Sequence, residues 1–117
     1  MKEITITIGL FAGISFLAFY VLWILYLAVM NLKGARDKGL LTPLTKALGM
    51  PILFIGYLLD ALLNFVVMTI ILLEIPQETT VSSRLKRHNK ESTGWRKAVA
   101  LWFEPILDPF DPDGDHI

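Results

Sequence analysis

The sequence predicts an all-α membrane protein, an antiparallel two-helix transmembrane hairpin followed by a C-terminal amphipathic interfacial helix. Residues 4–32 carry no charged side chain, and Asp60 is the only charged residue between Lys46 and Glu74. Hydrophobic residues make up 54% of the chain, and they are concentrated before residue 74. A helix needs about 20 apolar residues to cross about 30 Å of hydrocarbon, so both apolar stretches are long enough.

The first element is a predicted membrane span at about residues 8–32. Its apolar run is about twice as long as the apolar region of a signal peptide, which has 7–15 residues, and Lys2 is offset by Glu3. No small-residue cleavage site ends the run. We therefore expect an uncleaved first span.

The second span is predicted at about residues 51–73, after a linker of residues 33–50. Within the linker, Thr42 and Pro43 are typical of the start of a short helix, and Gly49 is typical of a helix stop. Pro51 can then begin the second span. Residues 1–74 would form a hairpin with both termini on one side of the bilayer.

The remaining residues, 75–117, are predicted to be a polar exposed connector, an amphipathic helix at about 95–104 and an acidic, turn-rich tail. Pro105 is expected to end or kink the helix. An apolar stripe with tryptophans suits a helix lying in the membrane interface, or alternatively one that packs on a partner or on the hairpin's own loops. The stripe consists of Trp95, Val99, Trp102 and Ile106.

Asp60 is the main candidate site residue, because a carboxylate at bilayer depth costs about 2.5–3.5 kcal/mol on insertion scales. Asn64 lies one helical turn later on the same face. The hairpin geometry places this face level with three possible hydrogen-bonding residues of the first span, Tyr20, Trp23 and Tyr26. We expect either a polar contact that fixes helix register or a proton- or ion-responsive site in an oligomeric pore.

Small residues mark two candidate helix-packing surfaces. Gly9 and Gly13 form a G-x-x-x-G pattern with Thr5 one turn earlier, and Gly56 lies one turn before Asp60. Such surfaces let helix backbones approach closely. The first can serve either packing within the hairpin or self-association.

Charged residues beside the second span predict a lipid partner. Arg84, Lys86 and Arg87 are expected to contact anionic headgroups rather than nucleic acid. Basic residues on the two sides of the hairpin are nearly balanced, and their placement favours cytoplasmic termini. His88 and His116 are isolated in the sequence and are expected to be solvated.

No motif predicts catalysis, a cofactor or a metal. The chain has no cysteine, and no phosphate-binding loop, zinc pair or catalytic triad pattern is present. The Asp-rich tail is similar to a calcium loop, but Pro109 occupies the first liganding position, so we interpret Asp-Pro and Asp-Gly as turn formers.

The sequence Gly94-Trp-Arg96, with Leu107-Asp-Pro-Phe-Asp-Pro-Asp-Gly114 and His116, resembles the tails of small two-span membrane proteins encoded by tailed bacteriophages and prophages. The resemblance covers about the last 35 residues and implies a bacterial inner (cytoplasmic) membrane. It brings no activity with it. We expect a non-enzymatic docking platform that binds a protein partner through residues 75–117. The alternative is a holin-like oligomeric permeabilising or ion-conducting protein with Asp60 inside the bundle.

Overall fold

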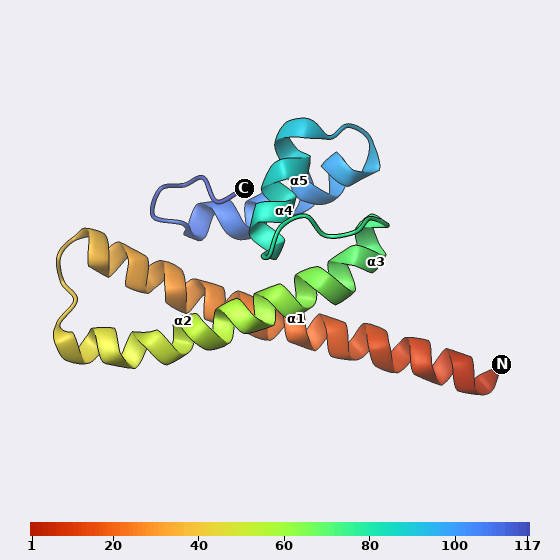
Figure 1. Ribbon diagram of the computed structural model, residues 1–117, viewed down its shortest axis with the longest axis horizontal. Coiled ribbons are helices and arrows are strands. Elements are labelled where there is room, and N and C mark those ends of the chain that lie inside the picture. The colour runs from red at the N-terminus through yellow and green to blue at the C-terminus, as the bar shows by residue number, and fades with distance from the viewer.

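The computed structural model describes residues 1–117 and confirms an all-helical chain with two long apolar helices (Figure 1). The elements are α1 (Lys2–Asp37), α2 (Pro43–Leu63), α3 (Thr69–Leu72), α4 (Val81–Glu91) and α5 (Trp95–Leu107). A π-helical turn, Asn64–Met68, joins α2 to α3, and a 3₁₀ turn, Asp108–Phe110, follows α5.

Helices α1 and α2 run antiparallel and contact each other (Figure 1). Two buried glycines of α2 face α1. A Cβ atom at Gly49 would lie 3.1 Å from Cδ1 of Leu32, which is closer than an ordinary contact, so Gly49 is the point of close approach. A Cβ atom at Gly56 would lie 3.8 Å from Cβ of Leu25, an ordinary contact distance, so the predicted need for a small residue at Gly56 stays a prediction.

The loop between the first two helices is much shorter than the predicted linker. Helix α1 continues to Asp37 and α2 begins at Pro43. The Thr42–Pro43 start is confirmed, because Thr42 Oγ1 accepts from Thr45 N at 3.2 Å in a capping box. The stop predicted at Gly49 is wrong. Helix α2 continues through Gly49 and Pro51, and Gly49 serves instead as the point of close contact with α1.

The segment expected to be an exposed connector is helical from Val81. Its N-cap is Thr80, whose hydroxyl accepts from Ser83 N at 3.2 Å. The resulting helix α4 buries Val81, Arg84, Leu85 and His88, so the exposed connector is a wrong prediction there. Helix α5 then begins after Gly94, whose φ of +76° favours glycine, and continues past Pro105 to Leu107.

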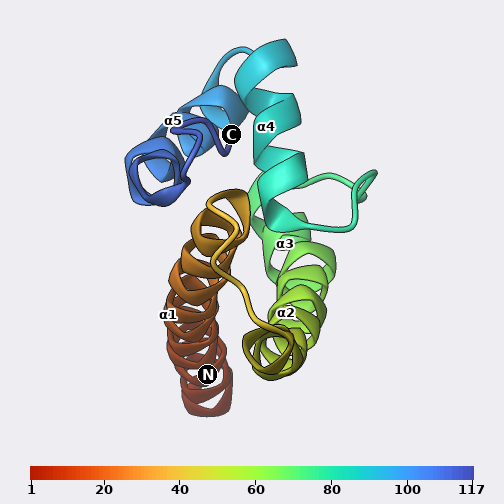
Figure 2. The same ribbon diagram turned by 90° about the vertical axis from the view of Figure 1, so that its left-hand side faces the viewer.

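Helices α4 and α5 lie together on one side of the α1–α2 pair (Figure 2). We call α4, α5 and residues 108–117 the C-terminal lobe. The hydrophobic core lies between this lobe and the α2–α3 segment, with side chains of α1 such as Phe19 and Trp23 packed against it. Its buried members are Leu63, Val67, Met68, Leu72, Val81, Leu85, Ala100, Leu107 and Ile117.

The rest of the helix pair has an apolar surface. Phe16 of α1 and Phe54 of α2 are 75% and 65% exposed, and Met30 is the only buried residue of α1. By length and composition, α1 and the α2–α3 segment are both able to cross a membrane. An uncovered apolar surface of this extent is typical of contact with lipid or with another protein.

Candidate functional site

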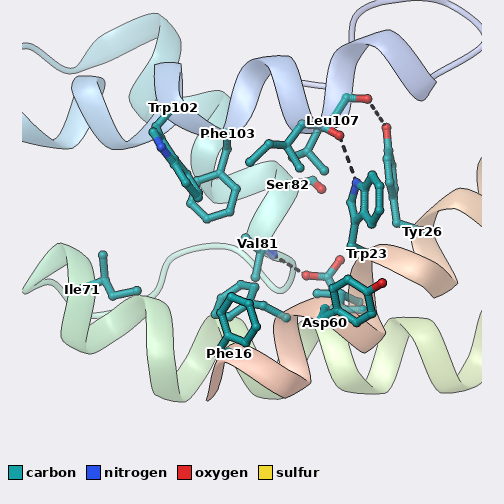
Figure 3. Close-up of a pocket in the computed structure, with 14 residues that line it drawn as sticks. Phe16, Trp23, Tyr26, Asp60, Ile71, Val81, Ser82, Trp102, Phe103 and Leu107 are labelled. Carbon is teal, nitrogen blue, oxygen red and sulfur yellow. Dashed lines mark hydrogen bonds between the residues drawn. The ribbon is translucent and has the colours of Figure 1, made fainter. Parts of the chain in front are cut away.

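Asp60 lies on α2 where the N-terminus of α4 meets the helix pair (Figure 3). Its Oδ1 accepts a hydrogen bond from the main-chain N–H of Val81 at 2.7 Å. A carboxylate at this position also interacts favourably with the positive end of the α4 dipole. The partner that the sequence required for Asp60 is therefore the chain's own α4.

The donors predicted for Asp60 bind elsewhere, although Trp23 and Tyr26 do lie at its level. Trp23 Nε1 donates to the carbonyl oxygen of Ile106 at 3.1 Å, and the Tyr26 hydroxyl donates to that of Leu107 (Figure 3). Carbonyl groups in the last turn of a helix lack intrahelical donors. Trp23 and Tyr26 of α1 therefore supply donors to the carbonyl groups at the C-terminal end of α5. Tyr20 is 53% exposed and has no such bond.

A cavity of about 510 Å³ adjoins Asp60. It lies where α1, α2, α3, α4 and α5 meet, and most of its wall is apolar (Figure 3). Its volume falls within the range of about 300–1,000 Å³ typical of small-molecule sites. The lining residues are Phe16, Phe19, Tyr20, Leu22, Trp23, Tyr26, Asp60, Ile71, Val81, Ser82, Trp102, Phe103, Ile106 and Leu107.

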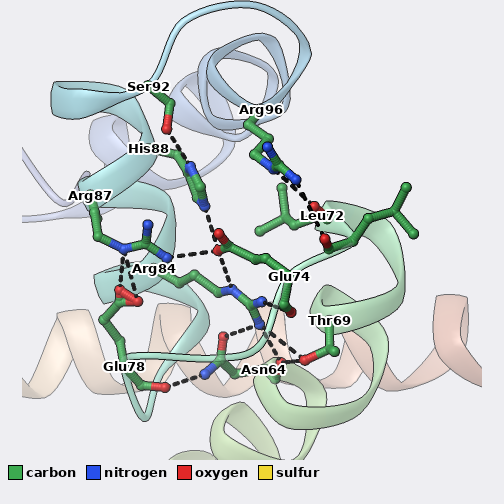
Figure 4. Close-up of polar contacts among 11 residues, drawn as sticks. Asn64, Thr69, Leu72, Glu74, Glu78, Arg84, Arg87, His88, Ser92 and Arg96 are labelled. Carbon is green, nitrogen blue, oxygen red and sulfur yellow. Dashed lines mark hydrogen bonds and ion pairs between the residues drawn. The ribbon is translucent and has the colours of Figure 1, made fainter.

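Asn64 and Arg84 join the π-helical turn to α4 (Figure 4). Arg84 is fully buried, and its Nη1 donates to the Asn64 carbonyl oxygen at 2.8 Å and to Asn64 Oδ1 at 3.3 Å. The Asn64 side-chain amide donates to the carbonyl oxygen of Glu78. A π-helical turn interrupts the i→i−4 bonding of a helix, and here the Asn64 carbonyl accepts from a buried guanidinium.

The Glu74 carboxylate collects three donors from α4 (Figure 4). Its Oε1 lies 3.1 Å from Arg84 Nε, 2.7 Å from Arg87 Nη2 and 2.6 Å from His88 Nε2. Burial alone would raise the pKa of Glu74, but the hydrogen bonds from His88, Arg87 and Arg84 together lower it to about 2. This cluster fixes the end of α3 to α4.

These contacts correct the predicted headgroup contacts of the basic cluster. Arg84 is inside the protein and cannot reach lipid. Arg87 Nε donates to Glu78 Oε2 at 2.6 Å, in addition to its bond with Glu74. Lys86 is half-buried and has no ion pair, so its headgroup contact stays a prediction.

The two histidines are not solvated as expected, because both are bonded within the lobe. His88 is 1% exposed, with Nδ1 2.6 Å from the Ser92 hydroxyl. The His116 ring lies 2.9 Å from Asp111 Oδ2 and 2.8 Å from the Ser82 hydroxyl.

The acidic tail folds back on the C-terminal half of α1. Lys33 Nζ lies 3.1 Å from Asp111 Oδ1 and 2.8 Å from Asp113 Oδ2. Asp108 Oδ1 accepts from the main-chain N–H groups of His116 and Ile117. Burial would raise the pKa of Asp111, but the Asp113 N–H, His116 and Lys33 outweigh it and lower the pKa to about 2. The carboxylates of Asp108 and Asp111 thus stabilise the turns of the tail, and those of Asp111 and Asp113 pair with Lys33 of α1.

The stripe predicted for α5 divides between two surroundings. Val99 and Ile106 pack against the core, whereas Trp95 and Trp102 are 47% and 65% exposed. Arg96 lies with its guanidinium carbon 4.8 Å from the Trp95 ring centroid, and its Nε donates to the Leu72 carbonyl oxygen. Helix α5 therefore packs on the chain itself by one side and leaves its tryptophans accessible.

The Gly9–Gly13 surface has no partner within the chain. No atom would lie within 4 Å of a Cβ at either position, and the Thr5 hydroxyl donates to the Met1 carbonyl oxygen. Self-association through this surface stays a prediction.

Sequence reasoning missed Glu74, Glu78 and the burial of α4. One signal was available, because Arg84, Arg87 and His88 lie three and four residues apart and so share one face of a helix. No protein-family model, curated protein or solved structure matches this chain.

Proposed function

We propose that this is a small, non-enzymatic integral membrane protein that serves as a docking platform at the bacterial inner membrane during phage infection. The helix pair is the anchor, and the C-terminal lobe is the platform. One observation carries the proposal: the lobe, which bears the charged residues of α4 and of the tail, is folded onto one side of the helix pair, while the other side is apolar and uncovered (Figure 2). The phage setting rests on the resemblance of the tail alone.

The position of the lobe limits how the pair can sit in lipid. Contacts with the lobe begin at Gly34 of α1, where an added Cβ atom would lie 3.5 Å from Cγ of Pro112. They extend to Leu72 of α3, whose carbonyl oxygen accepts from Arg96 Nε at 2.9 Å. Leu59 is the first residue of α2 that packs against the core. The stretch of α2 before it is shorter than the about 20 residues that cross a bilayer. A straight crossing of both helices would therefore carry part of the lobe into hydrocarbon.

Charges on α4 make that placement unfavourable. Lys90 and Glu91 are exposed and Lys86 is half-buried, and each charge at the bilayer centre costs about 2.5–3.5 kcal/mol on insertion scales. We infer that the uncovered side of the pair is immersed and that the lobe faces the headgroups and water. The N-terminal half of α1 runs clear of the lobe, which suits its immersion (Figure 1).

The exposed tryptophans of α5 support a platform at headgroup level. Tryptophan is enriched at membrane–water interfaces and is also frequent among the residues that dominate protein interfaces. We therefore assign the surface of Trp95 and Trp102 to contact with the protein partner or with the membrane–water interface.

The holin-like alternative needs Asp60 and Asn64 to face an interior shared by several copies. In one chain, Asp60 already accepts from Val81 N, and Asn64 is bonded to Glu78 and Arg84. A pore lined by these residues would first have to displace α4, which favours the platform.

Cysteine labelling tests the membrane arrangement. The chain has no cysteine, so Lys38→Cys in the α1–α2 loop and Thr93→Cys in the α4–α5 loop each give a single reporter. Immersion of one side predicts that a membrane-impermeant maleimide labels both from the same side. Labelling of the two positions from opposite sides would contradict this arrangement, and would show instead that both helices cross the bilayer completely.

Inducible expression in a bacterium tests the function. A docking platform leaves the membrane potential intact. A holin-like protein collapses the potential rapidly, and Asp60→Ala abolishes the collapse. That second pattern would overturn the proposal.

A further inference from the structure

The cavity beside Asp60 is polar at one end and apolar at the other (Figure 3). Asp60, Trp23 and Tyr26 lie at one end, and Ile71 and Trp102 lie at the opposite end. The hydrogen bonds of Trp23, Tyr26 and Asp60 that hold the lobe to the helix pair are made within the wall of the cavity, so a ligand can occupy the cavity without breaking them. Its shape suits an elongated molecule with one polar end.

The polar end offers an unused acceptor. Asp60 Oδ1 is bonded to Val81 N, whereas Oδ2 has no partner within the chain. No unpaired side-chain nitrogen or oxygen is buried in the protein, so Oδ2 reaches accessible space, and Asp60 lines the cavity. A ligand can therefore reach this oxygen without breaking the bond that holds α4.

No side-chain cation of the chain forms an ion pair with Asp60. The nearby His116 ring is bonded to Asp111 and Ser82, and Lys33 is paired with Asp111 and Asp113. The N–H groups at the start of α4 offset the carboxylate charge only in part, because a helix end is equivalent to about half an elementary charge. The polar end of the cavity therefore holds a carboxyl group that has no cationic partner within the chain.

Aromatic rings form much of the remaining wall. Trp23, Tyr26 and Phe103 belong to it, and the faces of such rings attract cations, most strongly the face of tryptophan. A carboxyl group at the same end of the cavity as the rings of Trp23 and Tyr26 is complementary to an ammonium group, and the apolar end is complementary to an alkyl chain.

We propose that the cavity binds a cationic amphiphile, with its ammonium group at Asp60 Oδ2 and its single alkyl chain extending toward Ile71 and Trp102. The wall near the apolar end includes exposed aromatic residues, Phe16 at 75% and Trp102 at 65%. The cavity is thus open to the apolar surroundings of the helix pair, and an amphiphile can enter from the membrane interface.

Three probes with the same chain and different heads test the proposal: dodecylammonium, dodecanol and dodecanoate. Each is titrated into the full-length protein in an uncharged maltoside detergent, and tryptophan fluorescence reports binding because Trp23 and Trp102 line the cavity. A charge-assisted hydrogen bond predicts that dodecylammonium binds about ten-fold or more tightly than dodecanol. Dodecanoate is expected to bind most weakly. Equal affinities for the three probes would overturn the proposal.

Two variants assign the binding to this cavity. Asp60→Asn keeps a carbonyl acceptor for Val81 N, so the lobe is expected to stay docked while the preference for dodecylammonium over dodecanol is lost. Ile71→Trp fills the apolar end and is expected to weaken all three probes. Ile70→Trp is its control, because Ile70 is 55% exposed and does not line the cavity. Unchanged head-group preference in Asp60→Asn would refute the role of the carboxylate.

Discussion

The N-terminal half of α1 and the segment from Asn64 to Leu72 are both strongly apolar in sequence, yet their surroundings differ. No residue of α1 before Met30 is buried. In the second segment, Asn64, Val67, Met68 and Leu72 are buried beneath the lobe. Hydropathy alone therefore does not distinguish a helix whose apolar surface stays uncovered from one that the chain covers itself.

Polar residues make the difference between the two regions. In the covered segment, Asn64 and Thr69 supply oxygens to Arg84, and Asp60 and Glu74 at its borders bind α4. The apolar run in the uncovered half of α1 contains Thr5, Thr7 and Ser15, and the hydroxyls of Thr5 and Thr7 donate to main-chain carbonyls of the same helix. The polar groups of the covered segment that bind α4 thus mark where the rest of the chain docks.

Removing Arg84 is the change that we expect to weaken this docking most. Arg84→Ala removes the Arg84–Glu74 ion pair and the hydrogen bond to the Asn64 carbonyl oxygen. Loss of one partner of a buried ion pair costs about 3–5 kcal/mol, and we expect the lower end of that range because Arg87 and His88 still donate to Glu74. Denaturant unfolding of the protein in detergent measures the loss.

Lys90→Ala is the matched control on the same helix, because Lys90 is exposed and unpaired, so its effect should be within about 0.5 kcal/mol. Equal effects of the two substitutions would show that the covered segment does not depend on this network.

Acid should release the lobe through Glu74. Its pKa is about 2 in the folded protein and 4.5 in its ordinary state, so the stabilisation is complete above about pH 4.5. It is lost as the pH falls from 4.5 toward 2, and its full size is up to about 3 kcal/mol. Unfolding measured against pH should show this slope, and Glu74→Gln should reduce it. An identical slope in Glu74→Gln would exclude Glu74 as its source.

A smaller effect is expected where α1 meets α5. Tyr26→Phe removes the donor to the Leu107 carbonyl oxygen and should destabilise the protein by about 0.5–1.5 kcal/mol. Tyr20→Phe removes an exposed hydroxyl without a partner and serves as the control. The comparison of their unfolding free energies checks the bond, and equal values would contradict it.

The smallest effect is expected at the tail. Lys33 pairs with Asp111 and Asp113, but its side chain and that of Asp113 are partly exposed, so these ion pairs are weakened by salt. Lys33→Ala should increase proteolysis of residues 108–117 at low ionic strength and change it little at high ionic strength. A salt-independent increase would indicate a packing role for the lysine stem.

The sequence was sufficient for the long apolar helices, the start of α2 at Thr42–Pro43 and the level of Asp60 beside Trp23. Each of these follows from local properties, namely apolar run length, capping chemistry and the rise per residue. The predicted helix at about residues 95–104 also agrees closely with α5, which ends at Leu107. Its apolar stripe was a useful signal because Val99 and Ile106 pack against the core.

The burial of α4 could not be predicted in the same way. Val81–Glu91 is rich in basic residues, and such a segment is normally exposed unless its charges are paired. Its partners, Glu74 and the Asn64 carbonyl, become available only through the turn after α3 and the π-helical turn, neither of which has a sequence signature that we recognised. Gly49 was likewise misread, because its contact with Leu32 is tertiary.

Spin labels in lipid nanodiscs test most directly which side of the molecule lipid covers. Phe54→Cys places a label on the uncovered side of α2, and Ser83→Cys places one on the exposed surface of α4. Immersion of the uncovered side predicts that the first label collides mainly with oxygen and the second mainly with a water-soluble nickel reagent. Strong oxygen collision at both positions would contradict the account, because the C-terminal lobe would then lie in hydrocarbon.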